Sequence, residues 1–276
     1  MNKIQLDFRI KCTILFNLSF TRQNSEAGTC IFTTNQFYML RVVSLILFVF
    51  VLSTSSFAQE GRTVDQLDGT FSFAKYQGAL SVHYSHLWKI GKSKKLAIGV
   101  GGRITSYLGA NQYYITAPAK ITSGSSGPFV IFKENIDENI DSLLIKSPQV
   151  MMINVSINIE YQIAARFTAG FNIDAIGFSF GADQSVNYIN GFTGKNTSAK
   201  PTYFNALLIS DNDHGSLNSE LFVKYKFSSK WSVRTGAQFL FTEYTSETEV
   251  QQYPEPNDRF RRKSLLFSLG VNYKIR

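Results

Sequence analysis

Three histidines, His83, His86 and His214, are the side chains of this sequence best suited to act as a base near neutral pH. A hydrolase would need one of them within hydrogen-bond reach of a nucleophilic hydroxyl and of an orienting acid. His83 alternates with Ser81 and Ser85, and alternate residues on one strand face stand roughly 7 Å apart, too far for a direct bond. The sequence therefore assigns no catalytic residue unless a neighbouring strand brings a partner to His83.

Charged side chains on one strand face are the second candidate chemistry. They occur in segments where polar and apolar residues alternate, at Arg103, Glu160, Asp174, Glu220, Lys224 and Arg234. Charges removed from water need partners, so the first interpretation is a paired charge network that fills a narrow lumen. The alternative is a narrow or gated conduit for small ions, which a conductance measurement would distinguish.

No metal or cofactor site is expected. Residues 211–215 read Asp-Asn-Asp-His-Gly, but the glycine and glutamate positions of a calcium loop are not matched, and a turn before a strand explains them. The two cysteines, Cys12 and Cys30, precede a segment that we expect to be removed on export. The exported protein would then have no thiol, which excludes disulfides and cysteine-ligated zinc.

The elements that must position these side chains are strands, because apolar and polar residues alternate with a period of two. Seven such segments are clear: Ala79 to Ile90, Leu96 to Thr105, Met151 to Gln162, Phe167 to Asp174, Leu217 to Phe227, Trp231 to Phe241 and Leu265 to Ile275. Their polar faces are rich in Gly, Ser, Thr and Asn with a few charges of both signs. That composition suits a narrow lumen better than an exterior that faces water.

The connections between these segments are unequal in length. They are short at 91–95, 164–166 and 228–230, and long at 118–147, 181–215 and 247–262. Short periplasmic turns and long outer loops are typical of bacterial outer-membrane barrels. Aromatic residues flank the short turns, as a periplasmic girdle would, at Trp88, Tyr161, Phe167, Tyr225, Phe227, Trp231 and Tyr273. We therefore predict an all-β, transmembrane, antiparallel up-and-down β-barrel in the outer membrane.

The direction of the strands predicts their number. If the short turns are periplasmic, the strand from Ala79 and the final strand both run inward, so closing the barrel needs one more outward strand, for which Gly69 to Tyr76 is the candidate. We predict eight strands with both termini periplasmic, or ten if Gln184 to Ile189 pairs with Tyr203 to Ile209. A soluble periplasmic barrel that binds an apolar ligand would alternate in the same way and is an alternative.

Residues 39–58 have the three parts of a secretory signal peptide. Arg41 precedes an apolar run, Val42 to Leu52, and small residues lead to an expected cut between Ala58 and Gln59. A permanent anchor would need roughly 20 apolar residues. Because export signals begin near the N-terminus, we predict that translation starts at Met39, and that residues 1–38 are a mis-assigned start or a disordered extension. A cytoplasmic extension before a signal anchor is the alternative.

Removing residues 1–58 takes away five cations and two carboxylates, so the net charge of the 276-residue chain falls from +8 to +5. The exported chain would comprise a short N-terminal segment, 59–68, and a barrel, 69–276. An aromatic content of 14% with only 6 Pro excludes a disordered chain. No uncharged apolar run of 18 or more residues follows residue 58, which excludes a helical transporter.

The signal, the amphipathic strands and the last strand, with Gly270-Val271-Asn272-Tyr273-Lys274, resemble the outer-membrane β-barrel domain family, the small porin-like proteins of Gram-negative outer membranes. The resemblance covers about residues 69–276 and implies insertion by the barrel-assembly machinery. The family's assembly signal usually ends in an aromatic residue, whereas this chain ends Lys274-Ile275-Arg276. Recognition would then depend on Tyr273 and the apolar residues before it.

Two loop segments predict further features. Glu-Asn-Ile-Asp occurs twice over 134–141 and places Ile136, Ile140 and Leu144 at helical spacing, which predicts a short amphipathic helix. Cations gather before the last strand at Arg259, Arg261, Arg262 and Lys263. At an outer rim they could bind lipopolysaccharide phosphates, since Arg matches phosphate well. The alternative is local pairing with acids of the same loop, Glu247, Glu249, Glu255 and Asp258.

The sequence thus predicts a non-enzymatic, monomeric outer-membrane barrel, porin-like or structural, that binds other molecules through its long outer loops if it binds them at all. Its expected contacts are outer-membrane lipid, lipopolysaccharide and, during assembly, the insertion machinery, with no nucleic acid. The alternative from another class is a lipid-modifying barrel hydrolase that uses His83 or His214.

Overall fold

The computed structural model of the protein describes residues 62–190, 193–208 and 212–275. The predicted start at Met39, the signal at 39–58 and the cleavage site between Ala58 and Gln59 lie outside these residues. Within the described ranges, no helix is long and apolar enough to cross a membrane. The charged residues of interest are positioned by β-strands.

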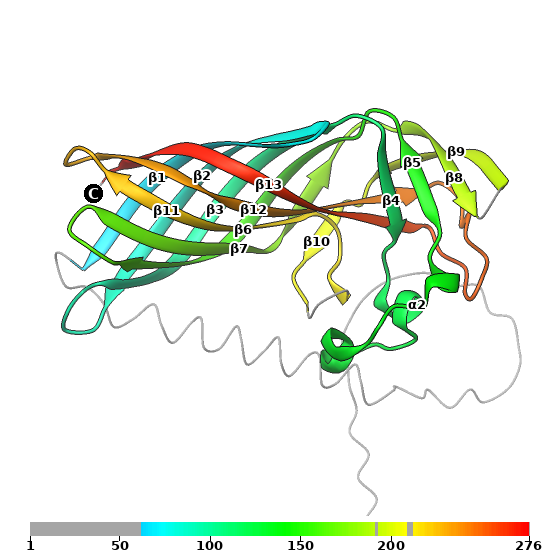
Figure 1. Ribbon diagram of the computed structural model, residues 1–276, viewed down its shortest axis with the longest axis horizontal. Helices are drawn as coiled ribbons and strands as arrows, with labels where there is room; N and C mark the ends of the chain where they lie inside the picture. Colours follow the sequence, from blue (N-terminus) through cyan, green and yellow to red (C-terminus); the bar gives the residue numbers. More distant parts are fainter. Residues whose placement is uncertain (1–61, 191–192, 209–211, 276) are drawn as a thin grey trace, which may run out of the picture. The chain divides into compact units, whose positions relative to one another are not determined.

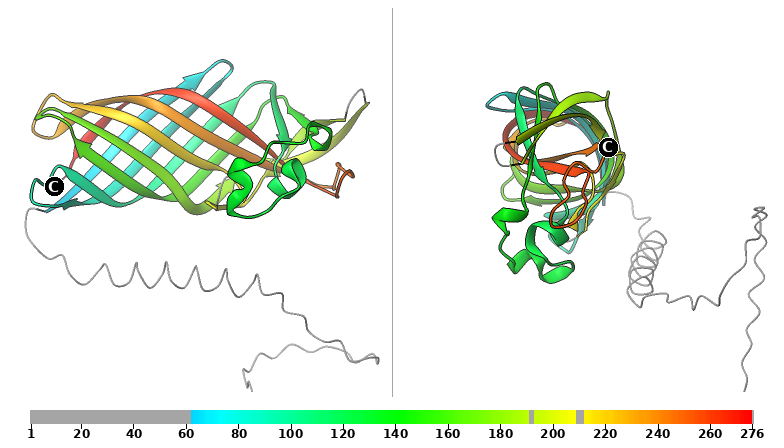
Figure 2. Two further views of the ribbon diagram at one scale, coloured as in Figure 1. Left: turned by 60° about the horizontal axis from the view of Figure 1, so that its bottom comes forward. Right: turned by 90° about the vertical axis from the view of Figure 1, so that its right-hand side faces the viewer.

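Eight long antiparallel strands pair in a closed ring. They are β1 (Thr63–Ala74), β2 (Gln77–Ile90), β3 (Leu96–Gly109), β6 (Gln149–Gln162), β7 (Phe167–Phe180), β11 (Leu217–Lys226), β12 (Trp231–Ser246) and β13 (Arg259–Lys274). Each pairs with the next in this order, and β13 pairs back to β1. The strands run obliquely around the ring (Figures 1 and 2). Eight strands leave an interior just wide enough for side chains.

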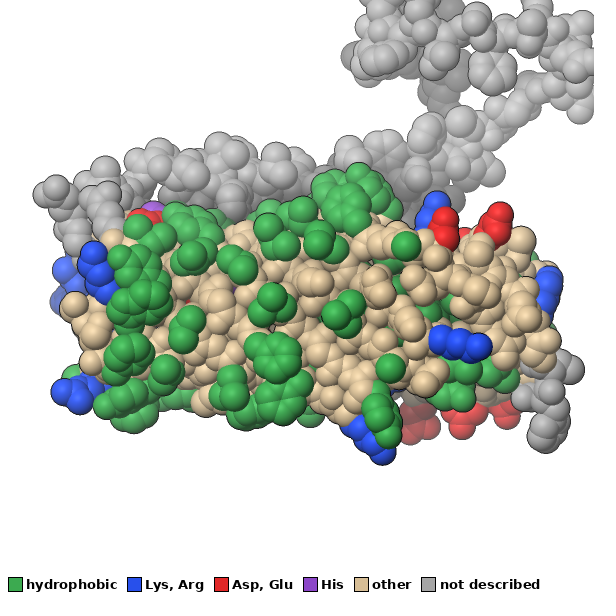
Figure 3. Space-filling view, turned by 90° about the horizontal axis from the view of Figure 1, so that it is seen from above, with side chains coloured by type: hydrophobic (Ala, Val, Ile, Leu, Met, Phe, Trp, Pro, Cys, Tyr) green, Lys and Arg blue, Asp and Glu red, His purple; other side chains and the backbone are tan. Residues whose placement is uncertain are grey.

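The two faces of the ring strands differ as the alternation predicts. Outward positions carry exposed apolar side chains, such as Phe71 on β1 and Leu80 on β2, whereas inward positions such as Ser81 and His83 are buried. Figure 3 shows hydrophobic side chains spread over the outer surface of the long strands, with Lys and Arg toward both ends. An exposed apolar surface around the strands, with a polar interior, is the pattern of a transmembrane barrel.

Four short strands continue the barrel at the end that carries the long connections. They are β4 (Gln112–Thr116), β5 (Ser142–Ile145), β8 (Gln184–Asn190) and β9 (Thr193–Pro201). They pair in this order, and β13 and β12 close the set through β4 and β9. We call this second, smaller ring, including the ends of β12 and β13 at 242–246 and 259–262, the loop-end extension. It lies at the opposite end from the C-terminus (Figure 1).

The remaining elements are short and also lie at the loop end. β10 (Phe204–Ala206) pairs with β7, and α2 (Ala119–Ser123), η1 (Pro128–Phe132) and η2 (Asp137–Asn139) connect β4 to β5. Seen from the end, this connection lies to one side of the ring (Figure 2).

An apolar core fills the loop end of the lumen and the loop-end extension. Toward this end, inward positions of the ring strands change from polar to apolar, at Ala79, Tyr107, Val150, Met152, Leu240 and Leu266. The core continues into the extension through Tyr114, Leu143, Ile145, Val186, Tyr188, Tyr244 and Phe260. The rings of Tyr114 and Tyr244 meet at 5.2 Å between centroids. One barrel therefore has an apolar filling at one end and a polar filling at the other.

The sheet of the described residues has thirteen strands rather than the eight or ten expected. Each of the eight predicted segments overlaps a ring strand, but β1 begins at Thr63, before the expected Gly69. The other five strands lie in the chain between β3 and β6 and between β7 and β11. Their backbone groups need hydrogen-bond partners once the connections fold, and sequence alternation does not reveal such short pairings.

Two predictions for the long connections are wrong. β8 pairs with β9 and not with Tyr203–Ile209, whose described part contains β10 against β7. The helix over 134–144 is not formed, since only the single turn η2 occurs there and Leu144 belongs to β5. β5 pairs with β4 on one edge and β8 on the other, so these residues gain backbone bonds that an isolated short helix could not offer.

Candidate functional site

The inward side chains near the short turns form a buried network of ions and amides, which we call the lumen network. The structure places all six predicted charges in it, and all six are buried: Arg103, Glu160, Asp174, Glu220, Lys224 and Arg234. Two further members are Asp68 and His83. The prediction missed Asp68 because it placed the start of the barrel at Gly69. The alternation of Gln66, Asp68 and Thr70 could have revealed it.

Arg234 on β12 holds the centre of the network. Its Nη1 lies 2.9 Å from Oδ1 of Asp68 on β1, and its Nη2 lies 2.8 Å from Oε2 of Glu220 on β11. Its guanidinium also lies over the ring of Phe222 at 3.8 Å. Gly170 on β7 makes room for that ring, because a Cβ there would collide with it. One arginine thus joins three strands of the ring and has a packed support.

Arg103 on β3 forms a second group with β7. Its Nε lies 3.4 Å from Oδ1 of Asp174, and its Nη2 donates a hydrogen bond to Oδ1 of Asn172 at 2.6 Å. The other oxygen of Asp174 accepts bonds from the side chain of Asn154 and the backbone of Asn218, at 2.8 and 3.1 Å. Groups from three other strands, β3, β6 and β11, therefore surround this carboxylate of β7.

Lys224 on β11 forms the group nearest the short turns. Its Nζ lies 2.6 Å from Oε1 of Glu160 and donates a bond to Oε1 of Gln66 at 2.9 Å. The amide of Gln66 donates to Glu160 at 2.6 Å, which closes a triangle. Asn272 donates to both Gln66 and Asp68, at 3.2 and 3.1 Å, and so connects this group to that of Arg234.

The charges of the lumen network are nearly balanced. Among the described residues, three cations face four carboxylates, and each cation lies within 3.4 Å of a carboxylate oxygen. Burying ions in this way is costly unless every partner is present. The arrangement therefore suits a fixed filling that joins the strands across the lumen.

His83 makes the contact that a single strand could not supply. Its Nε2 lies 2.8 Å from the hydroxyl of Ser156 on β6, and its Nδ1 lies 3.8 Å from Oδ2 of Asp68. The residue types match a hydrolase triad, but the His83 to Asp68 distance is too long for a hydrogen bond, and Arg234 binds that carboxylate instead. Ser156 has no exposed surface. The group is a buried part of the network.

The other two histidines lie outside the lumen network. His86 faces outward on β2, where its Nδ1 lies 2.6 Å from Oδ1 of Asp65 and its ring packs against Trp88 at 4.7 Å. Nδ1 of His214 lies 2.8 Å from the carbonyl of Phe204. Among the described residues, neither imidazole is hydrogen-bonded to a serine or threonine hydroxyl. No group of three or more His, Cys, Asp or Glu among the described residues could hold a metal ion.

Two of the four predicted rim cations pair with one buried carboxylate. Arg261 is buried in the loop-end extension, where its Nη2 lies 2.7 Å from Oε2 of Glu243. Arg259 binds the other oxygen of the same carboxylate through its Nε at 2.8 Å. Both cations therefore pair with a residue of the facing strand β12 rather than with an acid of the loop. Sequence reasoning missed Glu243 because cross-strand register cannot be read from alternation.

The electrostatics of Glu243 follow from these contacts. Burial alone would raise its pKa, but Arg261 and Arg259 outweigh burial and lower its pKa below the ordinary value. The ionised carboxylate therefore stabilises the junction between β12 and β13 at neutral pH.

Of the other two rim cations, Arg262 is partly exposed and Lys263 is exposed. Arg262 donates to the carbonyl of Tyr113 at 3.1 Å, and Lys263 lies 5.9 Å from the ring centroid of Phe241.

The predicted aromatic girdle lies at the short-turn ends of the ring strands. Phe167 and Tyr225 are cross-strand partners with ring centroids 5.1 Å apart, and Trp231 and Tyr273 are partners at 4.8 Å. The other members are Trp88, Tyr161 and Phe227. Side chains of this type anchor barrels at a membrane interface.

Comparison with known proteins gives matches in solved structures alone: no family model and no curated protein matches the chain. The crystal structure of Neisserial surface protein A matches at 10% identity and a TM-score of 0.31, covering 77% of this chain and 96% of that one. The N-terminal β-barrel domain of Pseudomonas aeruginosa OprF matches at 8% identity and 0.30, covering 79% and 100%.

Ail, the attachment invasion locus protein of Yersinia pestis, matches at 7% identity and a TM-score of 0.31, covering 79% of this chain and 100% of that one. All three are outer-membrane β-barrel proteins. At these values the likeness carries no function over to this chain. Function must therefore be argued from the residues of the chain itself.

Proposed function

We propose that this outer-membrane β-barrel is a closed, non-enzymatic membrane protein that contacts other molecules at its two ends rather than through its lumen. The eight-strand ring is its membrane-spanning part. The observation that carries the proposal is the filled lumen, with ion pairs near the short turns and an apolar core near the loops. The proposal favours a structural over a porin-like role.

Two layers oppose conduction. In the lumen network, an ion would have to displace a buried partner such as Arg234, which is bound to both Asp68 and Glu220. Beyond it, Tyr107 and Met152 are completely buried in the apolar core. A dry apolar layer excludes a hydrated ion because the ion would lose its water without gaining ligands.

Single-channel recording in planar bilayers tests the proposal. Refolded protein that shows heat-modifiable mobility on a detergent gel, as folded barrels do, is expected to leave the current at baseline. Steady, open currents of porin size would contradict the closed lumen. Protein that is soluble without detergent would contradict the membrane assignment and favour the periplasmic ligand-binding barrel.

A hydrolase is the second candidate, because Ser156, His83 and Asp68 do lie together in the lumen network. The matched variants are Ser156→Ala and His83→Gln, assayed with a fluorogenic ester and with phospholipid in mixed micelles. We expect wild type and both variants to be equally inactive. Hydrolysis by wild type that Ser156→Ala abolishes would establish the enzyme.

At the loop end we propose that Arg262 and Lys263 bind lipopolysaccharide phosphate, because both have exposed surface near the start of β13. Lys263 is exposed and Arg262 partly so. The test is mass spectrometry of lipopolysaccharide retained by wild type and by the variant R262S/K263S, with K195S/K200S as the control of equal charge. Equal retention by all three proteins would reject this part of the proposal.

A further inference from the structure

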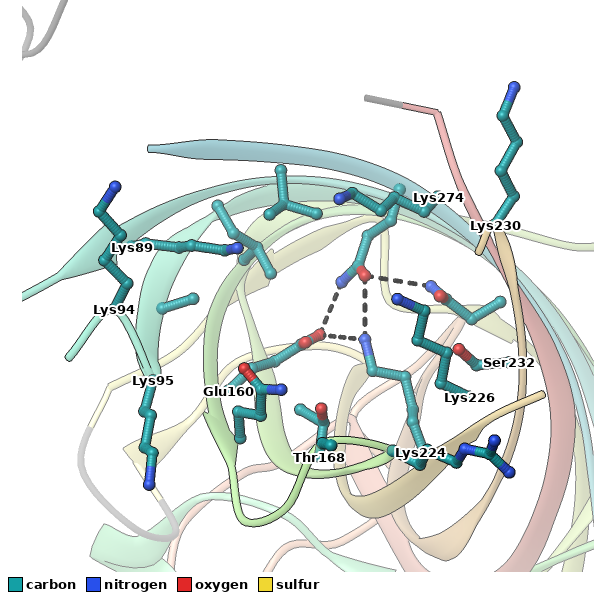
Figure 4. Close-up of a pocket in the computed structure, with 18 of the residues that line it drawn as sticks. Lys89, Lys94, Lys95, Glu160, Thr168, Lys224, Lys226, Lys230, Ser232 and Lys274 are labelled. Atoms are coloured by element: carbon teal, nitrogen blue, oxygen red, sulfur yellow. Dashed lines mark hydrogen bonds and ion pairs between the residues drawn. The ribbon is translucent and has the colours of Figure 1, made fainter. Parts of the chain in front are cut away.

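The mouth of the barrel at the short-turn end contains a cavity of about 150 Å³. Its floor is the hydrogen-bonded triangle of Lys224, Glu160 and Gln66 described above. Its wall includes inward residues at the ends of the ring strands, such as Thr168 and Ser232. Figure 4 shows the cavity and the side chains that surround it.

The charge around this cavity is one-sided. Three inward lysines come from three different strands, and four cations come from the rim. We call them the mouth lysines, Lys89, Lys226 and Lys274, and the rim cations, Lys94, Lys95, Arg166 and Lys230. Glu160 is the one carboxylate among the described residues that line the cavity, and Lys224 already neutralises it at 2.6 Å. This contrasts with the lumen network, where three cations face four carboxylates.

The mouth lysines line one cavity and have no counter-charge of their own. Lys89 experiences the positive charge of Lys274 and Lys226, and of Lys94 on the rim. In the described part of the chain, no carboxylate lies at ion-pair distance from any mouth lysine. Figure 4 shows Lys89, Lys226 and Lys274 around the Glu160 to Lys224 pair. Like charges confined at a narrow mouth repel one another, so an anion bound between them would be stabilised.

We propose that this mouth is a binding site for a phosphate-bearing anion. A phosphate group is compact enough for the cavity and presents several acceptor oxygens to the ammonium groups around it. Inorganic phosphate and phosphate monoesters carry nearly two negative charges, whereas a phosphodiester headgroup carries one. Each lysine can donate to the phosphate as a point charge on a flexible stem, without a fixed geometry.

The phosphate could come from a lipid headgroup of the adjacent leaflet or from a soluble phosphorylated compound. The inward direction of the mouth lysines suits a ligand that enters the lumen, whereas the rim cations can reach a headgroup at the barrel edge. The proposal goes beyond the proposed function, since a closed lumen requires no ligand at its mouth.

The test uses two arms with the folded, full-length exported chain. In the first, calorimetry measures binding of inorganic phosphate and pyrophosphate to protein in uncharged detergent at low salt. In the second, native mass spectrometry measures phosphatidylglycerol retained from mixed micelles. The variant K89Q/K226Q/K274Q removes the mouth lysines. The control K146Q/K195Q/K200Q removes three exposed lysines of the loop end with the same change in net charge.

We expect the mouth variant to bind at least one probe roughly tenfold more weakly than wild type, and the control to bind as wild type does. Added salt should weaken the wild-type interaction. If the mouth variant loses binding only in calorimetry, the source of the phosphate is a soluble compound. If it loses binding only in native mass spectrometry, the source is a lipid headgroup. Absence of wild-type binding in both arms, or equal binding by wild type and the mouth variant, would overturn the site. So would a preference for hexaglutamate over both phosphate probes. Conductance tests the closed lumen separately.

Discussion

The lumen network and the loop-end apolar core fill the same barrel by opposite means. Near the short turns, inward positions carry ions, and Arg234 alone connects Asp68 with Glu220 across three strands. Near the loops, most of the filling is a buried apolar cluster that includes Leu143 and Phe260, beside the single ion-pair group of Glu243. The stability of the lumen network depends on specific ion pairs. The stability of the apolar core depends mainly on the area of apolar surface removed from water.

The difference predicts how each region fails. Removing one ion from the network leaves its partners buried and unpaired, which is costlier than losing the pair as a whole. Removing an apolar group leaves a cavity whose cost depends on local packing. The extension also contacts the ring mainly through β12 and β13, so damage there should stay local.

The largest expected effect is from Arg234→Met. It leaves Asp68 and Glu220 buried without their cation, and we expect a loss of about 3–5 kcal/mol in the free energy of unfolding in lipid vesicles. The triple variant D68N/E220Q/R234M removes the unpaired charge and should recover most of that loss. A loss from Arg234→Met below about 1 kcal/mol, the value typical of exposed pairs, would show that the network is hydrated.

The next effect is from Leu143→Ala in β5. Leu143 is completely buried in the apolar core, and its truncation should destabilise the extension by about 2–4 kcal/mol. Hydrogen exchange should rise over β4 and β5 while β1 and β2 keep their protection. Equal loss of protection in both regions would mean that the two fillings unfold as one unit.

The smallest effect concerns pH. Because the pKa of Glu243 is lowered in the folded protein, its contribution to stability is present above the ordinary glutamate pKa of 4.5 and is lost as pH falls through the folded-state pKa. Pepsin cleavage of the extension, normalised to an unstructured substrate, should therefore accelerate as pH falls below 4.5. Glu243→Gln should flatten this dependence, and an unchanged pH profile would exclude the carboxylate as its source.

Much of the membrane-spanning ring was predictable because period-two alternation reports which face each residue belongs to. That information sufficed to place Arg103, Asp174 and Lys224 on the lumen face. It does not report which residues are opposite one another, because register depends on pairing between strands. Hence Ser156 was not identified as the partner of His83, nor Glu243 as the partner of Arg261.

The long connections were less predictable for a related reason. Short strands such as β4 and β5 form because partners from distant parts of the chain complete their backbone hydrogen bonds. The isoleucine and leucine spacing at 136–144 fits a helix locally, but the tertiary pairing of β5 overrides it. Local pattern therefore identified the ring and its inward charges better than it identified the second ring.

The central claim, a filled and closed lumen, can be tested most directly by thiol labelling. With Cys12 and Cys30 replaced by Ser, Ser85→Cys introduces a thiol of nearly the same shape at an inward position that is 1% exposed. Ser232→Cys is the matched control at the mouth cavity. We predict that a small, charged, water-soluble thiol reagent labels the cysteine at 232 readily and the cysteine at 85 only after unfolding. Comparable labelling rates at both positions in the folded protein would contradict the closed lumen.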